Sequence, residues 1–97
     1  MSILYILHRS PYSASEMQTA LSLAKPEDGI ILAQDAVLAL RSTPKEINIE
    51  EASRKNIRFY AIKADMDARS VKHIEGVKII DYDDLVELLN QYESTFS

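Results

Sequence analysis

The sequence predicts an α/β domain in which a mainly parallel sheet of four strands, in the order 2-1-3-4, is covered by helices on both faces. Short apolar runs of strand length occur four times, each run ends in a polar cluster, and each cluster begins a stretch with helical spacing. Strands that alternate with helices are joined by crossover connections, which make the strands parallel. We expect one three-layer domain over residues 1–97, and the pattern is compatible with a fifth short strand.

The strands are expected over residues 3–7, 30–33, 57–62 and 77–80. In a parallel sheet the polar clusters that follow the strands lie at one edge, and functional residues gather at that edge. We therefore take the strand-end residues as the candidate site. They are His8, Arg9, Ser10, Gln34, Asp35, Lys63, Asp65, Arg69 and Asp81.

The first helix is indicated by its start and by its apolar stripe. Ser13 and Glu16 have the spacing of a capping box, and Pro26 ends the helix. Between them, apolar residues at helical spacing form one face toward the sheet: Met17, Ala20, Leu21 and Ala24.

Three further helices are expected later in the chain. Asn48 is placed to cap a short helix that ends near Asn56, after a loop from Arg41, and Asp65 to cap a helix over residues 66–71. The last helix, residues 83–92, has an apolar face and acids in its first turn. Residues 93–97 are expected to be a frayed tail.

The run that follows Asp35 is apolar at five consecutive positions, 36–40. A helix against a sheet buries one stripe only, so we expect part of this run to face a partner chain. The interface candidates are Ala36, Val37, Leu38 and Leu40. The alternative is a short buried segment under the next loop.

Composition narrows the class of protein. The 97 residues carry a net charge of −4, which does not favour direct binding to nucleic acid. No apolar run approaches the length of a membrane span, and the first residues lack the features of a signal peptide, so a cytoplasmic protein is expected. Because the chain has no cysteine, it has no thiolate nucleophile and no persulfide carrier of its own.

Cofactor sites are not predicted. The first strand–helix turn lacks the glycines that let a backbone approach phosphates, which argues against a nucleotide. His8 and His73 are expected at opposite ends of the sheet. Asp35, Asp65 and Asp81 are a conceivable magnesium site, but we favour structural roles for them, with Asp35 and Asp65 as helix caps and Asp81 closing a turn.

His8 offers an enzymatic hypothesis. With the strand order 2-1-3-4, a crevice opens where the first and third strands diverge, with His8 and Lys63 on its rim. A histidine there would be placed as a general acid or base. The sequence supplies no orienting partner, so a structural hydrogen bond in the loop is the favoured interpretation of His8.

At these same clusters the sequence resembles the DsrH/TusB family. The resemblance lies in the segments 7–11, 34–37, 60–69 and 80–86, in order and with compatible spacing over essentially the whole chain. It implies the DsrE-like fold and membership of a complex such as TusBCD or DsrEFH, in which a sister subunit carries the principal sulfur-bearing cysteine. Some members of the family have a cysteine in the first helix, where this chain has Ala20, and many have a glycine where this chain has Ala36.

The resemblance and the missing thiol together predict a non-catalytic subunit of a cytoplasmic sulfur relay. Such a relay passes persulfide sulfur toward 2-thiolation of the wobble uridine in tRNA. The expected partners are TusC-like and TusD-like sister subunits or further copies of the chain. Two alternatives stay open, a stand-alone homo-oligomeric regulatory protein and a small enzyme that uses His8.

Overall fold

A computed structural model describes residues 2–9, 16–40, 55–72 and 76–96 of the chain. Its centre is a five-stranded, all-parallel sheet in the order β4-β3-β2-β1-β5. The strands are β1 (Ile3–Leu7), β2 (Gly29–Leu32), β3 (Arg58–Ile62), β4 (Val77–Ile80) and β5 (Ser94–Phe96). The α/β class, the parallel sheet and the fifth short strand agree with the sequence-based prediction.

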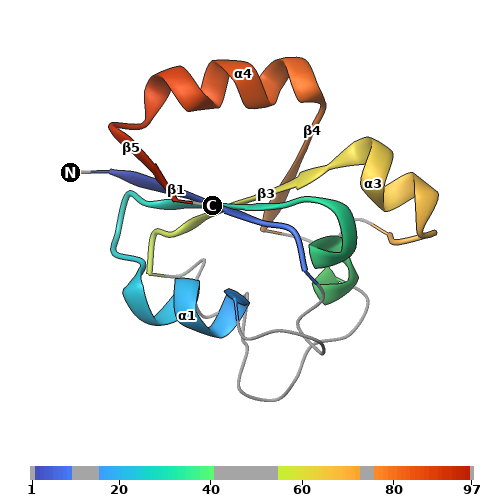
Figure 1. Ribbon diagram of the computed structural model, residues 1–97, viewed down its shortest axis with the longest axis horizontal. Coiled ribbons are helices and arrows are strands. Elements are labelled where there is room, and N and C mark those ends of the chain that lie inside the picture. Colours follow the sequence, from blue (N-terminus) through green and yellow to red (C-terminus); the bar gives the residue numbers. More distant parts are fainter. Residues whose placement is uncertain (1, 10–15, 41–54, 73–75, 97) are drawn as a thin grey trace.

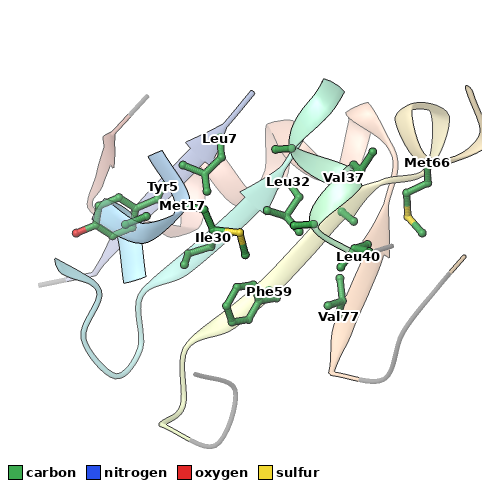
Figure 2. Close-up of a cluster of buried hydrophobic side chains, with 14 of the residues drawn as sticks. Tyr5, Leu7, Met17, Ile30, Leu32, Val37, Leu40, Phe59, Met66 and Val77 are labelled. Carbon is green, nitrogen blue, oxygen red and sulfur yellow. The ribbon is translucent and has the colours of Figure 1, made fainter. Parts of the chain in front are cut away.

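Alternating side chains of the strands build one core on each face of the sheet. On one face, residues such as Tyr5, Ile30 and Phe59 are buried together with Met17 and Val37 (Figure 2). On the other face, Leu4, Ile31, Tyr60 and Ile62 form a smaller core with Leu88 and Tyr92. The two cores follow from the twofold alternation of side chains along a strand, because each strand has both faces covered.

The helices divide between these two faces. α1 (Glu16–Leu23), the 3-10 helix η1 (Gln34–Leu40) and α3 (Lys63–Ala68) all contribute to the larger core, and α4 (Tyr82–Gln91) covers the smaller one (Figure 1). The connections from β1 to β4 step across the sheet in one direction, and the connection through α4 returns to β5 beside β1. Right-handed crossovers therefore place α4 on the face opposite the other helices.

The predicted strand order 2-1-3-4 is wrong. β2, not β1, is the neighbour of β3, with Ile31 opposite Tyr60 in the register. β1 pairs with β2 on one side and with β5 on the other. Both orders permit right-handed crossovers, so the alternation of strands and helices alone does not choose between them.

The first helix agrees with its predicted stripe. Met17 and Ala20 are buried, and Leu21 and Ala24 pack against the same core. The predicted capping box includes Ser13, which lies outside the described residues, as do the Asn48 cap and His73. No helix in the described ranges is long and apolar enough to cross a membrane.

The apolar run after Asp35 forms η1 and is core, which removes the reason for expecting a partner there. Ala36, Val37 and Leu40 are buried within the chain, and Leu38 is partly buried against the same cluster. A 3-10 helix has three residues per turn, and this one contacts both the sheet and α3, so more than one of its sides is covered. The premise that a single stripe must be buried was wrong for this segment.

The C-terminal segment is a strand and not a frayed tail. β5 lies parallel to β1 with Thr95 opposite Leu4, and the rings of Tyr5 and Phe96 are 5.8 Å apart. Tyr92, which ends α4, reaches the smaller core over Gly29. A Cβ atom on Gly29 would lie 2.5 Å from the Tyr92 hydroxyl oxygen, so only glycine permits this packing.

Candidate functional site

The carboxyl ends of β1 to β4 meet at one edge of the sheet, because all strands are parallel. The connection that leaves β3 runs on one face, whereas the connection that leaves β4 runs on the other. Such a reversal is where parallel sheets place their sites. It falls between β3 and β4, and not between the first and third strands as predicted.

A hydrogen-bonded group of polar residues occupies this place. We call it the strand-end cluster, and it consists of Gln34, Asp35, Asp65, Arg69 and Tyr82. Four of them lie at the consecutive strand–helix junctions after β2, β3 and β4, and Arg69 is the C-cap of α3. Four of the five belong to the predicted strand-end set.

Asp65 is the centre of the cluster. Its Oδ2 atom accepts a hydrogen bond of 2.8 Å from the backbone N–H of Gln34 and one of 3.2 Å from the hydroxyl of Tyr82. Its side chain is 15% exposed, so the carboxylate itself is mostly shielded from water, although both donors lie at the surface. One carboxylate thus connects the segments that follow β2, β3 and β4.

Arg69 balances the charge of two carboxylates. Its Nε donates to Oδ1 of Asp35 at 2.9 Å, and its Nη1 donates to the backbone carbonyl of Asp65 at 3.2 Å. The same Nη1 lies 3.8 Å from Oδ1 of Asp65. The guanidinium therefore fixes η1 to α3, since Asp35 belongs to η1 and Asp65 to α3.

Gln34 is in an uncommon backbone conformation, with a φ of 48°. In this left-handed geometry its N–H points to Asp65, and the charged hydrogen bond offsets the cost of the conformation. Ala36, where the resembling family often has glycine, is buried in η1 and is not among the described residues with positive φ. Alanine is therefore tolerated at that position.

Tyr82 is the one member of the cluster that the predicted strand-end set does not contain. Its hydroxyl donates to Asp65 although 52% of the residue is exposed. Burial of its hydroxyl end, with the hydrogen bond to Asp65 and the charge of that carboxylate, raises the pKa of Tyr82 above its ordinary value. Its position directly after Asp81, at the end of the fourth predicted strand, was the feature of the sequence that could have identified it.

The remaining predicted site residues lie elsewhere. His8 and Arg9 follow β1, and Lys63 begins α3 after β3. Because β2 lies between these strands, the backbones of β1 and β3 are separated by two strand spacings, about 9–10 Å. The crevice that the enzymatic hypothesis needed between His8 and Lys63 is therefore filled by β2. Ser10 is outside the described residues.

The capping roles differ from those predicted. Asp81 is the N-cap of α4, where its side chain accepts from the N–H of Asp84 at 2.8 Å and the side chain of Asp84 accepts from the N–H of Asp81. Asp65 lies in the first turn of α3 but caps no N–H of that helix, whose N-cap is Ile62. Asp35 lies inside η1 and pairs with Arg69.

The chemistry of the strand-end cluster is that of a fixed polar surface. Asp35 and Asp65 are both paired with Arg69, and Asp81 is engaged at the start of α4. In the parts of the chain that the structure describes, no three metal-ligating side chains come together. The cluster offers carboxylate oxygens and a phenol to a partner, with one exposed carboxylate at Asp35.

These features define a class, a small all-parallel α/β domain with a polar carboxyl edge and no thiol of its own. The sequence belongs to the DsrH-like family, since the family model described as "DsrH like protein" matches residues 9–95. It is therefore a protein of the sulfur-relay type. A comparison with curated proteins gave no match.

Two solved structures have a similar fold. The crystal structure of the ychN protein from E. coli superposes with a TM-score of 0.75 at 17% identity, covering 99% of this chain and 97% of that one. The solution structure of protein Tm0979 from Thermotoga maritima gives a TM-score of 0.63 at 26% identity, with 92% of each chain covered. The five-stranded parallel fold is thus shared with known proteins.

Proposed function

We propose that this protein is a non-catalytic subunit of a cytoplasmic sulfur-relay complex resembling TusBCD or DsrEFH. The complex would support the transfer of persulfide sulfur toward 2-thiolation of the tRNA wobble uridine. The observation that carries the proposal is the family match over residues 9–95 in a chain without cysteine. A persulfide forms on a cysteine thiol, which this chain lacks, so it serves a relay whose sulfur is held by another subunit.

The strand-end cluster supports a positioning role. Its hydrogen bonds connect the segments that follow β2, β3 and β4. Two of its members stay exposed: Asp35, which is paired with Arg69, and Tyr82, which is bonded to Asp65. A surface held in this way keeps its shape when a sister subunit docks and hands on its sulfur. The proposed partners are TusC-like and TusD-like chains, and no direct contact with tRNA is proposed.

The test is a labelling experiment with sulfur-35. The purified complex is incubated with a cysteine desulfurase and labelled cysteine, and the chains are separated without reductant. We expect label that reductant releases on the TusD-like chain and none on this chain. A TusD-like chain whose principal cysteine is replaced by serine is the control and should carry no label.

Deletion of the gene tests the destination of the sulfur. We expect the 2-thiouridine content of the affected tRNAs to fall sharply, and expression of the wild-type chain to restore it. Label on this chain that reductant releases would contradict the non-catalytic role. Unchanged 2-thiouridine would contradict tRNA as the destination.

A further inference from the structure

One side of α4 carries three exposed apolar side chains. Tyr82, Val86 and Leu89 are 52%, 59% and 39% exposed. Their spacing of four and three residues places them in one row along the helix, which we call the α4 stripe. The side of α4 that faces the sheet is formed by other residues, of which Leu88 is buried and Leu85 partly buried.

No described element of the chain covers this row. α4 lies by itself on its face of the sheet, and α1 and η1 are on the opposite face (Figure 1). Contiguous apolar patches on a protein surface often mark sites where another molecule binds. The row is therefore a surface that a partner can bury.

The charge of the segment that contains α4 selects the kind of partner. From residue 79 to residue 97 the chain has acidic residues and no lysine or arginine, and the nearest basic residue before this segment is Lys78 on β4. The acids are Asp81, Asp83, Asp84, Glu87 and Glu93. At 100° per residue, Asp83 and Glu87 lie beside Val86 on the outer side of the helix.

A second copy of the same stripe would bring these acids against one another. Pairing of two α4 helices would bring two acidic helix surfaces together, with no basic residue on either helix to compensate. Juxtaposed like charges oppose such a pairing, whereas a surface of opposite sign is attracted. A different chain with basic side chains around an apolar centre could bury the stripe and pair with the acids beside it.

We propose that the α4 stripe is the docking surface for a different protein chain whose contact surface is apolar at its centre and bordered by lysine or arginine. This inference rests on the proposed function, because the candidate partners are the sister subunits of the proposed sulfur-relay complex. Tyr82 belongs both to the α4 stripe and to the strand-end cluster, through its hydrogen bond to Asp65. A chain docked on α4 is thereby placed next to the carboxyl edge of the sheet.

The experiment measures binding of this chain to the TusC-like and TusD-like chains from the same organism. We expect Val86→Lys to weaken binding about tenfold or more, because it puts a charge at the centre of the contact. Gln91→Lys, with the same charge change at an exposed position on another side of α4, is the matched control and should bind like the wild type.

Salt provides a second measurement. Binding of the wild type should weaken as salt rises from about 50 to about 300 mM, since exposed charges are screened over this range. The double variant Asp83→Asn with Glu87→Gln should bind about two- to fivefold more weakly at low salt and depend less on salt.

The outcomes separate this inference from the proposed function. If the wild type binds neither sister chain, the proposed function fails and the inference fails with it. If the wild type binds and Val86→Lys binds equally well, only the inference fails. If the wild type alone forms a dimer in sedimentation that Val86→Lys abolishes, the α4 stripe pairs with a second copy and the inference is wrong.

Discussion

Asp65 shows how one side chain organises the carboxyl edge of the sheet. Its carboxylate accepts from the backbone of Gln34 and from Tyr82, and Arg69 lies close to its other oxygen. Hydrogen bonds to a charged acceptor are stronger than neutral ones, and this acceptor is mostly shielded from water. The left-handed Gln34 depends on the same carboxylate.

Replacement of Asp65 by asparagine is expected to lower the free energy of unfolding by about 1–2 kcal/mol. Asparagine keeps the shape but has one oxygen instead of two, and its amide would face the guanidinium of Arg69. Urea unfolding measures the change. Asp67→Asn, at an exposed position of the same helix, is the matched control and should change stability by less than about 0.5 kcal/mol. Equal losses in the two variants would contradict the central role of Asp65.

For most residues of the strand-end cluster, the sequence predicted their position in the fold but not their contacts. Gln34, Asp35, Asp65 and Arg69 follow apolar runs, and their place after a strand was readable from the sequence. Their mutual contacts depend on which strand ends are adjacent, which the pattern leaves undecided. Tyr82 was readable as a strand-end residue too, but an aromatic side chain is more often core than polar site.

At the scale of elements, η1 and α4 differ from their predicted roles: η1 is core where a contact surface was expected, and α4 has an exposed apolar row. Val37 in η1 is fully buried, although its run suggested a contact surface, and Val86 in α4 is 59% exposed, although α4 looked like an ordinary amphipathic helix. Five apolar residues in a row are compatible with a covered 3-10 helix as well as with an interface. Sequence does not distinguish the two, because the covering elements come from elsewhere in the chain.

The same substitution at these two valines should therefore have opposite consequences. Val37→Lys places an ammonium group in the larger core, and we expect a loss of more than about 3 kcal/mol in urea unfolding, a large part of the stability of so small a domain. Val86→Lys should retain the wild-type far-UV dichroism spectrum and lose less than about 0.5 kcal/mol in urea unfolding. A Val37→Lys variant as stable as the wild type would contradict the placement of η1 in the core.

At the scale of the whole molecule, the strand order decides which residues meet. The strands β1 and β4 lie where the sequence predicts them, and β2 and β3 differ by one residue at their starts or ends. Strand position follows from local apolar runs, whereas order follows from long connections whose lengths fit more than one neighbour. In the observed order 4-3-2-1-5, β2 separates His8 from Lys63, and the end of β2 lies beside the end of β3, which brings Gln34 to Asp65.

The smaller core joins the C-terminal part of the molecule to the middle of the sheet through Tyr92. Its ring lies over Gly29 of β2, and its hydroxyl is 3.4 Å from that of Tyr60 on β3. Burial, together with the hydrogen bond to Tyr60, raises the pKa of Tyr92 to about 12 from an ordinary value of 10.0. The folded molecule therefore holds this proton at pH values where the unfolded chain releases it.

This difference predicts how global stability depends on alkaline pH. The contribution of Tyr92 is fully present below pH 10, and it is lost as pH rises toward 12, because only the unfolded chain gains the free energy of ionisation in that range. At about 1.4 kcal/mol per pKa unit, the loss attributable to Tyr92 is about 2–3 kcal/mol.

Urea unfolding at several pH values from 8 to 12 measures this loss, with Tyr92→Phe as the control that keeps the ring over Gly29 but cannot ionise. Tyr5 and Tyr82, whose pKa values are also raised, titrate in both proteins, so the difference between them isolates Tyr92. Identical pH dependence in the two proteins would show that the hydroxyl of Tyr92 ionises as readily in the folded molecule as in the unfolded chain.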